Sequence, residues 1–289
     1  MIERDDQGRK RAVAAPWLLQ GPGLLFLGVF FFFPLYTLGR MALSSRPSRF
    51  ANPEFTWHWS NFDSALSRYG SQFTRSFVYA GLATLLALVV AYPLAYVIAF
   101  RGGRWKNVLL GLVVVPFFTN FLIRTLAWKT ILGDQGTVVS LLRDVSLLGD
   151  GATLLRTPLA VIGGLTYNFL PFMVLPIYVA LEKIDPRLVD AARDLYSNTW
   201  RAFRKVVFPL SLPGVFAGSL LVFIPAAGDF VNAYYLGSTN QTMIGSVVQN
   251  QFLVQLDYPV AAALSFVFMT IVMLIVIAYG WILGTEDLV

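Results

Sequence analysis

The sequence predicts an all-α integral membrane protein with six transmembrane helices. Of its 289 residues, 56% are apolar and 13% are charged, whereas roughly 25% of the residues in a soluble domain carry a charge. The mean hydropathy is correspondingly high, at +0.64. Six segments contain the run of about 20 mostly apolar residues that a helix needs to cross a bilayer. A soluble globule could not hide so much apolar surface, which argues against a water-soluble enzyme.

The predicted spans, in chain order, are 17–39, 76–100, 107–132, 159–181, 208–235 and 260–283. The first follows Arg9, Lys10 and Arg11, as the core of a signal peptide would. Its apolar stretch is too long for such a core and no small-residue cleavage site follows it, so we expect a retained span. Prolines fall within five spans, and we expect each to kink its helix because it removes an intrahelical hydrogen bond. They are Pro34, Pro93, Pro116, Pro171, Pro176 and Pro225.

The distribution of lysine and arginine predicts that both termini are cytoplasmic. Thirteen of the 22 such residues lie in the N-terminal tail and in the second and fourth connections, against seven in the other three connections. Positive charge is retained on the cytoplasmic side of a membrane, although the first outer connection is an exception with five arginines. The chain thus divides into a cytoplasmic tail at 1–16, a six-span domain at 17–283 and a second cytoplasmic tail at 284–289. The net charge of +6 then reflects topology rather than nucleic-acid binding.

Missing residue types limit the chemistry of the chain. It has no cysteine and only one histidine, which excludes thiolate catalysis and a Cys- or His-rich metal site. It has no phosphate-binding loop of the form G-x-x-x-x-G-K-[ST]. Its spans contain only three ionisable residues, Arg124, Lys129 and Asp229, whereas ion-coupled carriers usually contain several. We therefore expect the chain to bind no cofactor itself and, if it moves a solute uphill, to use ATP bound by a partner.

Residues 182–207 form the longest connection on the predicted cytoplasmic side. Asp185 followed by Pro186 is a strong signal for the start of a helix, an N-cap and then a proline at the first position. Beyond them, apolar residues recur every three or four positions and form one stripe of a helix. They are Val189, Ala192, Tyr196, Trp200, Phe203 and Val207. Such an amphipathic helix suits either the membrane surface or a groove on another protein.

The same loop resembles the signature of ABC importer permeases, E-A-A-x3-G-x9-I-x-L-P. The matching residues are Asp190-Ala191-Ala192, Tyr196, Val206 and Phe208-Pro209. In that family the loop is a coupling helix that docks into the ATPase subunit. The resemblance implies a coupling role for Asp190, Ala191, Ala192, Arg193, Tyr196, Ser197, Asn198 and Arg201. Tyrosine does not readily adopt the positive φ that the family's glycine permits, so we expect Asn198 to take over the turn.

Further stretches resemble the spermidine/putrescine permeases of the PotB type, among them Val115-Pro116-Phe117, Leu170–Val174 and Pro209–Gly214. The resemblance implies a type I ABC importer permease in the bacterial inner membrane that forms a path for polyamines. It implies three partners: a second permease subunit, a dimer of ATPase subunits carrying ATP and Mg²⁺, and an extracytoplasmic substrate-binding protein. Two alternatives stay open. One is the same machinery for another small solute (an opine, an aminophosphonate or thiamine), and the other is a self-sufficient ion-coupled carrier or channel.

Asp229 is the only acidic residue within a predicted span. A carboxylate at the centre of a membrane helix costs about 2.5–3.5 kcal/mol, so it should face a cavity or a partner. Polyamines are flexible polycations that carboxylates and aromatic faces can bind, and Asn232, Tyr234 and Tyr235 follow within two turns. We therefore predict a weak transit site around Asp229.

The alternative for Asp229 is a structural ion pair with Arg124 or Lys129. Arg124 and Asn120 are also candidates for the path because they lie within the third span. Amides inside spans, such as Asn120 and Asn168, more often form hydrogen bonds between helices.

Overall fold

The computed structural model describes residues 20–46, 51–146, 148–149, 151–196 and 198–283. These residues are mainly helical, as predicted, and their two strands, β1 (Ser44–Ser45) and β2 (Glu54–Phe55), pair antiparallel. The helices are η1 (Gly28–Phe32), α2 (Phe33–Ala42), α3 (Ser60–Arg101), η2 (Gly103–Trp105), α4 (Lys106–Val114), η3 (Val115–Phe118), α5 (Phe121–Ile131), α6 (Thr137–Asp144), α7 (Pro158–Glu182), α8 (Pro186–Tyr196), α9 (Thr199–Ala202), η4 (Phe203–Val207), α10 (Phe208–Ala227), α11 (Val231–Leu236), η5 (Thr239–Gln241), α12 (Ile244–Gln249), η6 (Asn250–Val254) and α13 (Tyr258–Leu283).

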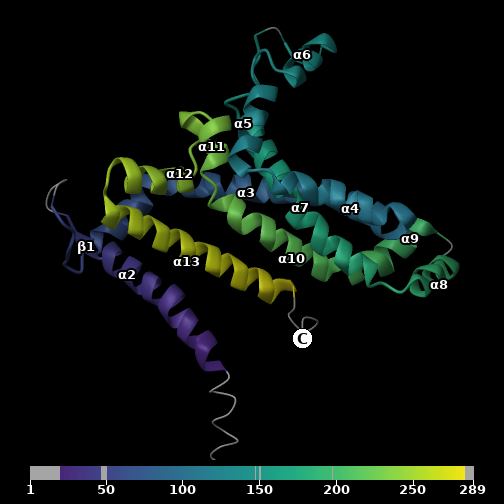
Figure 1. The fold of residues 1–289 in the computed structure, drawn as a ribbon, viewed down its shortest axis with the longest axis horizontal. Coiled ribbons are helices and arrows are strands. Elements are labelled where there is room, and N and C mark those ends of the chain that lie inside the picture. The colour runs from purple at the N-terminus through teal and green to yellow at the C-terminus, as the bar shows by residue number, and fades with distance from the viewer. Residues whose placement is uncertain (1–19, 47–50, 147, 150, 197, 284–289) are drawn as a thin grey trace, which may run out of the picture.

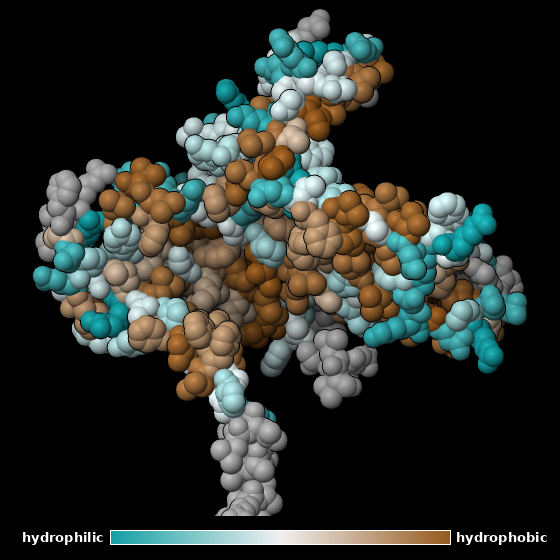
Figure 2. Space-filling model, in the orientation of Figure 1, coloured by the Kyte–Doolittle hydropathy of each residue, from teal (hydrophilic) through white to brown (hydrophobic). Residues whose placement is uncertain are grey.

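Five helices of the described chain are long and apolar enough to cross a membrane: Gln20–Ala42, α3, α7, Thr199–Ala227 and α13. A bent pair of helices, Gly103–Phe118 followed by Phe121–Ile131 at 94°, would be the sixth if it forms one broken span rather than a re-entrant loop. In Figure 1, α3, α7, α10 and α13 lie side by side, with α8 and α9 at one end of the bundle and α12 at the other. Figure 2 shows hydrophobic residues across the middle of the molecule and hydrophilic ones towards its ends, as a bilayer requires.

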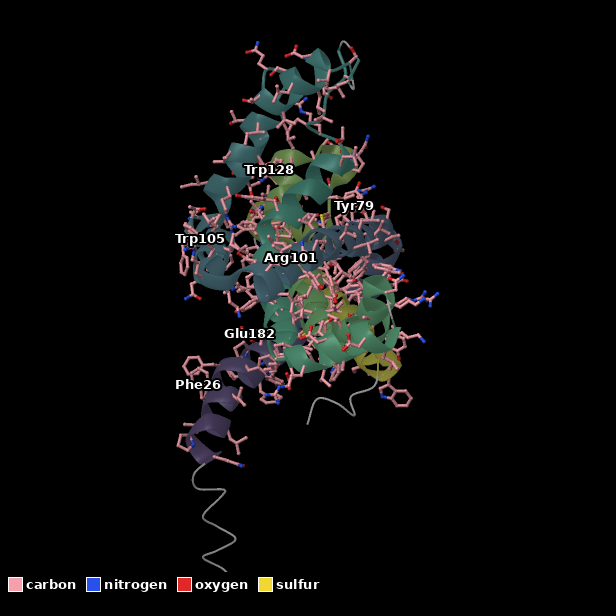
Figure 3. The ribbon with its side chains drawn as sticks, turned by 90° about the vertical axis from the view of Figure 1, so that its right-hand side faces the viewer. Phe26, Tyr79, Arg101, Trp105, Trp128 and Glu182 are labelled. Carbon is pink, nitrogen blue, oxygen red and sulfur yellow. The ribbon has the colours of Figure 1, made fainter. Side chains whose placement is uncertain are left out.

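The first span stands apart from this bundle. None of the residues in its most apolar window is buried, and Phe26 projects from it away from the other helices (Figure 3). It contacts the bundle near its C-terminal end, where Ala42 packs with Ala262 and Ala263 of α13. Most of this span is therefore available to lipid or to another chain.

Three predicted spans differ from the helices that form. α3 starts at Ser60 rather than at 76 and is 42 residues long. The third span breaks after η3, where the Asn120 side chain accepts the backbone N–H of Leu122 at 2.9 Å and so begins α5. The fifth ends at Ala227, and residues 228–230 separate it from α11. Continuous helices over 107–132 and 208–235 are thus wrong predictions, because counting apolar residues does not register side chains that cap a new helix.

Most prolines are accommodated without ending a helix. α3, α7 and α10 continue through Pro93, Pro171 and Pro225. Pro116 lies in η3, the tight turn that precedes the break in the third span. Just before Pro209, η4 widens the helix into a π turn, which is one way to relieve the clash between a proline ring and the preceding turn.

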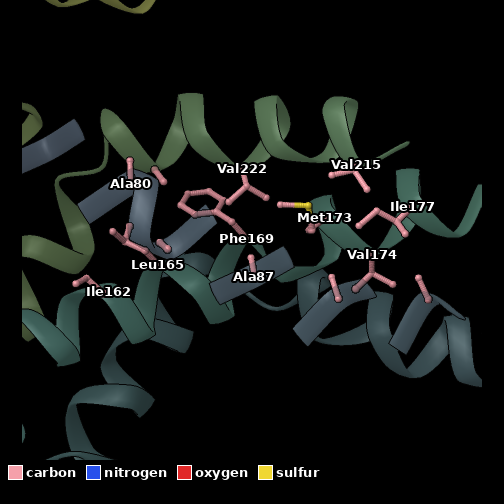
Figure 4. Close-up of a cluster of buried hydrophobic side chains, with 14 of the residues drawn as sticks. Ala80, Ala87, Ile162, Leu165, Phe169, Met173, Val174, Ile177, Val215 and Val222 are labelled. Carbon is pink, nitrogen blue, oxygen red and sulfur yellow. The ribbon is translucent and has the colours of Figure 1, made fainter. Parts of the chain in front are cut away.

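Small residues let α3, α7 and α10 pack closely, as is common for helices in membranes. α3 presents a row of fully buried alanines, namely Ala80, Ala83, Ala87, Ala91 and Ala95. Met173, Val174 and Ile177 of α7 lie between this row and α10 (Figure 4). On α10, a methyl group added at Gly214 would lie 2.6 Å from the carbonyl oxygen of Pro176. The contact between α7 and α10 therefore has no room for a side chain at Gly214.

Replacing Gly214 by alanine should destabilise the protein. Overpacking of this kind costs about 1–3 kcal/mol, which exceeds the ~0.5–1 kcal/mol that alanine gains over glycine within a helix. Unfolding of the detergent-solubilised chain measures the change. Gly81→Ala on α3 is the matched control, because no atom lies within 4 Å of its added methyl group. Equal stability of the two variants would contradict the tight α7–α10 contact.

Candidate coupling surface and transport path

The start of the predicted coupling helix is confirmed. α8 begins at Pro186, and the Asp185 carboxylate accepts the backbone N–H of Arg187 at 2.9 Å. The proline occupies a position whose N–H would have no intrahelical partner, so it costs nothing there. Sequence and structure agree at this end of the helix.

The expected single stripe is instead two helices. α8 ends at Tyr196 and α9 begins at Thr199. Asn198 takes over the turn as expected, but not in the left-handed region: its φ is −151°, and its side chain accepts the backbone N–H of Trp200 at 2.8 Å. It acts as an N-cap of α9. Ser197 and the side chain of Arg193 lie outside the described residues.

α8 has a second apolar face that the sequence interpretation missed. Val189 and Ala192 are buried against their own chain. Beside this buried stripe, Leu188 is 52% exposed and Leu195 is 75% exposed. The missed signal is the seven-residue spacing of these two leucines, which places them on one side of a helix. Asp190, Ala191 and Arg201 are also exposed.

A cluster of rings connects this region to the bundle. The centre of the Phe203 ring lies 5.4 Å from that of Trp200, in a stacked arrangement. It lies 5.8 Å from the centre of the Tyr92 ring on α3. The Tyr92 hydroxyl is hydrogen bonded to that of Ser211 on α10, at 2.7 Å. The α9–η4 region therefore contacts α3 and α10 through one group of packed aromatic side chains.

The same end contains an ion pair. The Lys106 Nζ lies 2.6 Å from Glu182 Oε1, joining the first residue of α4 to the last residue of α7. Lys106 also lies 5.2 Å from the centre of the Tyr178 ring. These contacts hold the third span against the helix that leads into α8.

A buried polar cluster lies at the break after α10. Asp229 is 8% exposed, and its carboxylate accepts the backbone N–H of Asn232 at 2.7 Å. The Asn232 side chain accepts a hydrogen bond from Asn168 at 3.0 Å, and Asn168 also donates to Thr125 at 3.2 Å. Asn168 thus forms the interhelical hydrogen bonds expected of it. The cluster ties α11 to α7 and α5, and the sequence could not indicate that Thr125 belongs to it.

Asp229 does not form the alternative ion pair with any cation of the described chain. The Arg124 guanidinium lies 5.6 Å from the Phe117 ring and 5.7 Å from the Phe121 ring. Lys129 lies near a different ring, that of Tyr235. The Asp229 carboxylate instead accepts a backbone N–H near the start of α11.

The other predicted path residues are divided between two places. The centre of the Tyr235 ring lies 5.9 Å from the Lys129 Nζ. The Tyr234 ring packs edge-on against it, with the two ring centres 5.0 Å apart. Asn120 caps α5 and is exposed, beside the buried Arg124 at the break in the third span. The structure therefore groups Asp229 with Asn232 and the tyrosine pair on α11, and it places Asn120 and Arg124 on α5 and its cap.

α11 fits tightly against α7. A methyl group added at Gly164 would lie 2.4 Å from a methyl carbon of Leu236 and 2.8 Å from the side-chain oxygen of Asn232. A methyl group added at the preceding residue, Gly163, would have no neighbouring atom within 4 Å. Only a glycine at 164 leaves room for α11 where it lies.

These observations together describe the membrane-embedded component of a transporter, with a broken span, an exposed amphipathic helix and no ATP-binding loop. Residues 83–283 match the family model for the binding-protein-dependent transport system inner membrane component. The chain belongs to this family. It is a multi-pass permease subunit rather than an enzyme.

Individual relatives agree with this assignment. Over 200 residues the chain is 40% identical to the spermidine/putrescine transport system permease protein PotB of Haemophilus influenzae, covering 69% of this chain and 70% of the relative. It is 36% identical to the Escherichia coli K12 protein of the same name, over 89% of this chain and 93% of the relative.

Solved structures have the same fold. A bacterial ABC transporter that imports the acidic polysaccharide alginate matches with a TM-score of 0.72 at 16% identity, covering 98% of this chain and 100% of the other. A second structure, of a bacterial alginate transporter in complex with an alginate pentasaccharide-bound periplasmic protein, matches with a TM-score of 0.67 at 14% identity, covering 98% of each chain.

Gly164→Ala should displace α11 while leaving the rest of the bundle folded. The clash involves a flexible leucine and a buried amide, so we expect a loss of about 1–3 kcal/mol in unfolding free energy and faster backbone hydrogen exchange over residues 231–236. Gly163→Ala serves as the control and should exchange like the parent chain. Unchanged exchange in Gly164→Ala would mean that α11 is not held by this contact.

Proposed function

We propose that this chain is the permease subunit of an ATP-driven importer and forms part of the path for spermidine and putrescine. The substrate class is supported by the relatives at 36–40% identity, whose names specify spermidine/putrescine transport. The alginate transporters share only the fold, since their identity is 14–16%. An importer for another small solute and an ion-coupled carrier have no comparable support.

The exposed face of α8 carries the mechanism. Leu188 and Leu195 lie on one side of its exposed surface and Asp190 lies on another, and exposed apolar residues suit a helix that docks into a groove. We propose that this groove belongs to a partner ATPase, one of a dimer that binds ATP and Mg²⁺. Closure of the dimer would move α8 and, through Phe203 and Tyr92, shift α3 and α10.

The orientation follows from this assignment. α8 and the ends of α3 and α7 that adjoin the lysine- and arginine-rich connections lie at one end of the bundle (Figure 1). We propose that this end is cytoplasmic, with both termini on the same side. The opposite end, with α12 and the β1–β2 pair, would then receive substrate from an external binding protein.

A second permease subunit would complete the path. The first span has no buried residue in its most apolar window, so it can lie against that subunit on one side and lipid on the other. We propose that Asp229, Asn232, Tyr234 and Tyr235 form a weak transit site, with Asn120 and Arg124 at its border.

Reconstitution of the chain with its partners in proteoliposomes tests the proposal. We expect ATP-dependent, saturable uptake of radiolabelled spermidine and putrescine. Asp190→Lys should lower uptake at least tenfold and separate it from ATP hydrolysis, while the chain stays inserted, because reversing a charge at a docking surface typically costs 2 kcal/mol or more, about thirtyfold.

The matched control is Asp134→Lys, another exposed aspartate, remote from α8 on the connection between α5 and α6. It should transport like the parent. Uptake without ATP, or uptake that survives Asp190→Lys unchanged, would instead indicate an ion-coupled carrier or channel.

A further inference from the structure

A polar pocket of about 560 Å³ lies at the end of the bundle opposite α8, between α3, α11, the 237–242 segment and α12 with η6. All of its lining residues are uncharged, and most carry a hydroxyl or amide group, including Tyr69, Ser238, Asn250 and Gln251. A hydrogen bond of 2.7 Å from Gln251 to the Tyr69 hydroxyl joins two of its walls. In a chain that is 56% apolar, such a concentration of neutral hydrogen-bonding groups is unusual.

One wall of the pocket is the segment that carries the buried carboxylate. Ala233, one turn after Asp229, lines the pocket. Ser246, which also lines it, directs its hydroxyl at the carbonyl oxygen of Phe230 at 3.4 Å. Asp229 has no cation partner anywhere in the described residues. The pocket therefore adjoins the segment that carries Asp229, although the carboxylate itself is not among the lining residues.

One tyrosine ring beside the pocket already contacts an ammonium group of the chain. The Lys129 Nζ lies 5.9 Å from the centre of the Tyr235 ring, within the range of a cation–π interaction. Tyr234 is the neighbouring ring, 70% exposed, and it lines the pocket. The Tyr235 ring thus already contacts the ammonium group of Lys129, whereas the Tyr234 ring is exposed to the pocket.

A guanidinium lies at another edge of the pocket. Arg75 donates a hydrogen bond to the carbonyl oxygen of Thr242, a lining residue, at 2.9 Å. Its charge disfavours a cation on that wall.

We propose that this pocket is a transient binding site for a primary ammonium group, such as one end of a polyamine on its way to Asp229. The inference rests on the proposed function, because it supplies the step between delivery and transit. Neutral oxygens and a single ring bind an ammonium weakly, and weak binding suits a path, since a transported ion must also leave each site.

Photolabelling tests the site directly. The reagent is a diamine that carries a photoreactive diazirine in its carbon chain, applied to the assembled transporter without its binding protein. We expect label on residues 233–251, competed by putrescine and not by butane-1,4-diol, which has the same carbon chain with hydroxyl groups in place of ammonium groups. Label elsewhere only, or equal competition by the diol, would overturn the proposal.

Two variants sharpen the test. Tyr234→Leu should raise the putrescine concentration for half-maximal competition about two- to fivefold, the range expected for one exposed cation–π contact. Asn250→Asp should lower it several-fold by adding a carboxylate. The control is Tyr36→Leu, which removes a tyrosine of similar exposure from the first span. If both pocket variants compete like this control, the site is wrong.

Uptake assays separate the two proposals. If the parent transporter labels as expected but takes up neither spermidine nor putrescine, the polyamine assignment fails and the ammonium site stands. If the pocket variants change only the dependence of uptake on binding-protein concentration, with labelling unaffected, the pocket is a contact surface for that protein and the inference fails.

Discussion

The structure depends on one constraint, that a helix ending within a bilayer must have its backbone N–H groups satisfied by the chain itself. Asn120 does this where the third span breaks, and Asp229 does it where α11 begins. Both side chains are polar residues in otherwise apolar stretches, and both accept a backbone N–H at the start of a helix. Because these caps are available, the chain can bend by 94° in its third span and begin α11 beside α10. The candidate path is built at these two breaks.

Close packing by small residues gives these breaks a rigid frame. The alanine row of α3 and Gly214 of α10 bring three long helices together, and Gly164 does the same for α11. The frame extends from the ring cluster around Phe203 at one end to the polar cluster of Asn168 and Asn232 at the other. A displacement of α8 would therefore reach the path through well-packed side chains, which deform little.

Local patterns in the sequence predicted the local structure well. Apolar runs located the fourth and last spans to within two residues at each end, 159–181 against α7 and 260–283 against α13. Asp185-Pro186 predicted the start of α8 because an N-cap acts within a few residues. The breaks were missed because an apolar count treats Asn120 and Asp229 as tolerated exceptions. The contacts of Asn168 with Thr125 and Asn232 connect residues 43 and 64 positions apart, and no spacing in a single sequence reveals such pairs.

The arginines of the first outer connection have local contacts in the structure. Their number runs against the proposed orientation, in which positive charge is retained inside. Two of those in the described chain form hydrogen bonds between segments. Arg46 donates to the carbonyl oxygens of Ala51 and Leu256. Arg75 donates to the carbonyl oxygen of Thr242. Arg46 joins the segment after α2 to the chain after η6, and Arg75 joins α3 to the segment before α12. A guanidinium has several N–H donors and can therefore form such hydrogen bonds. These arginines thus have a local structural role beside any effect on topology. The remaining asymmetry is the stronger guide to which side faces the cytoplasm.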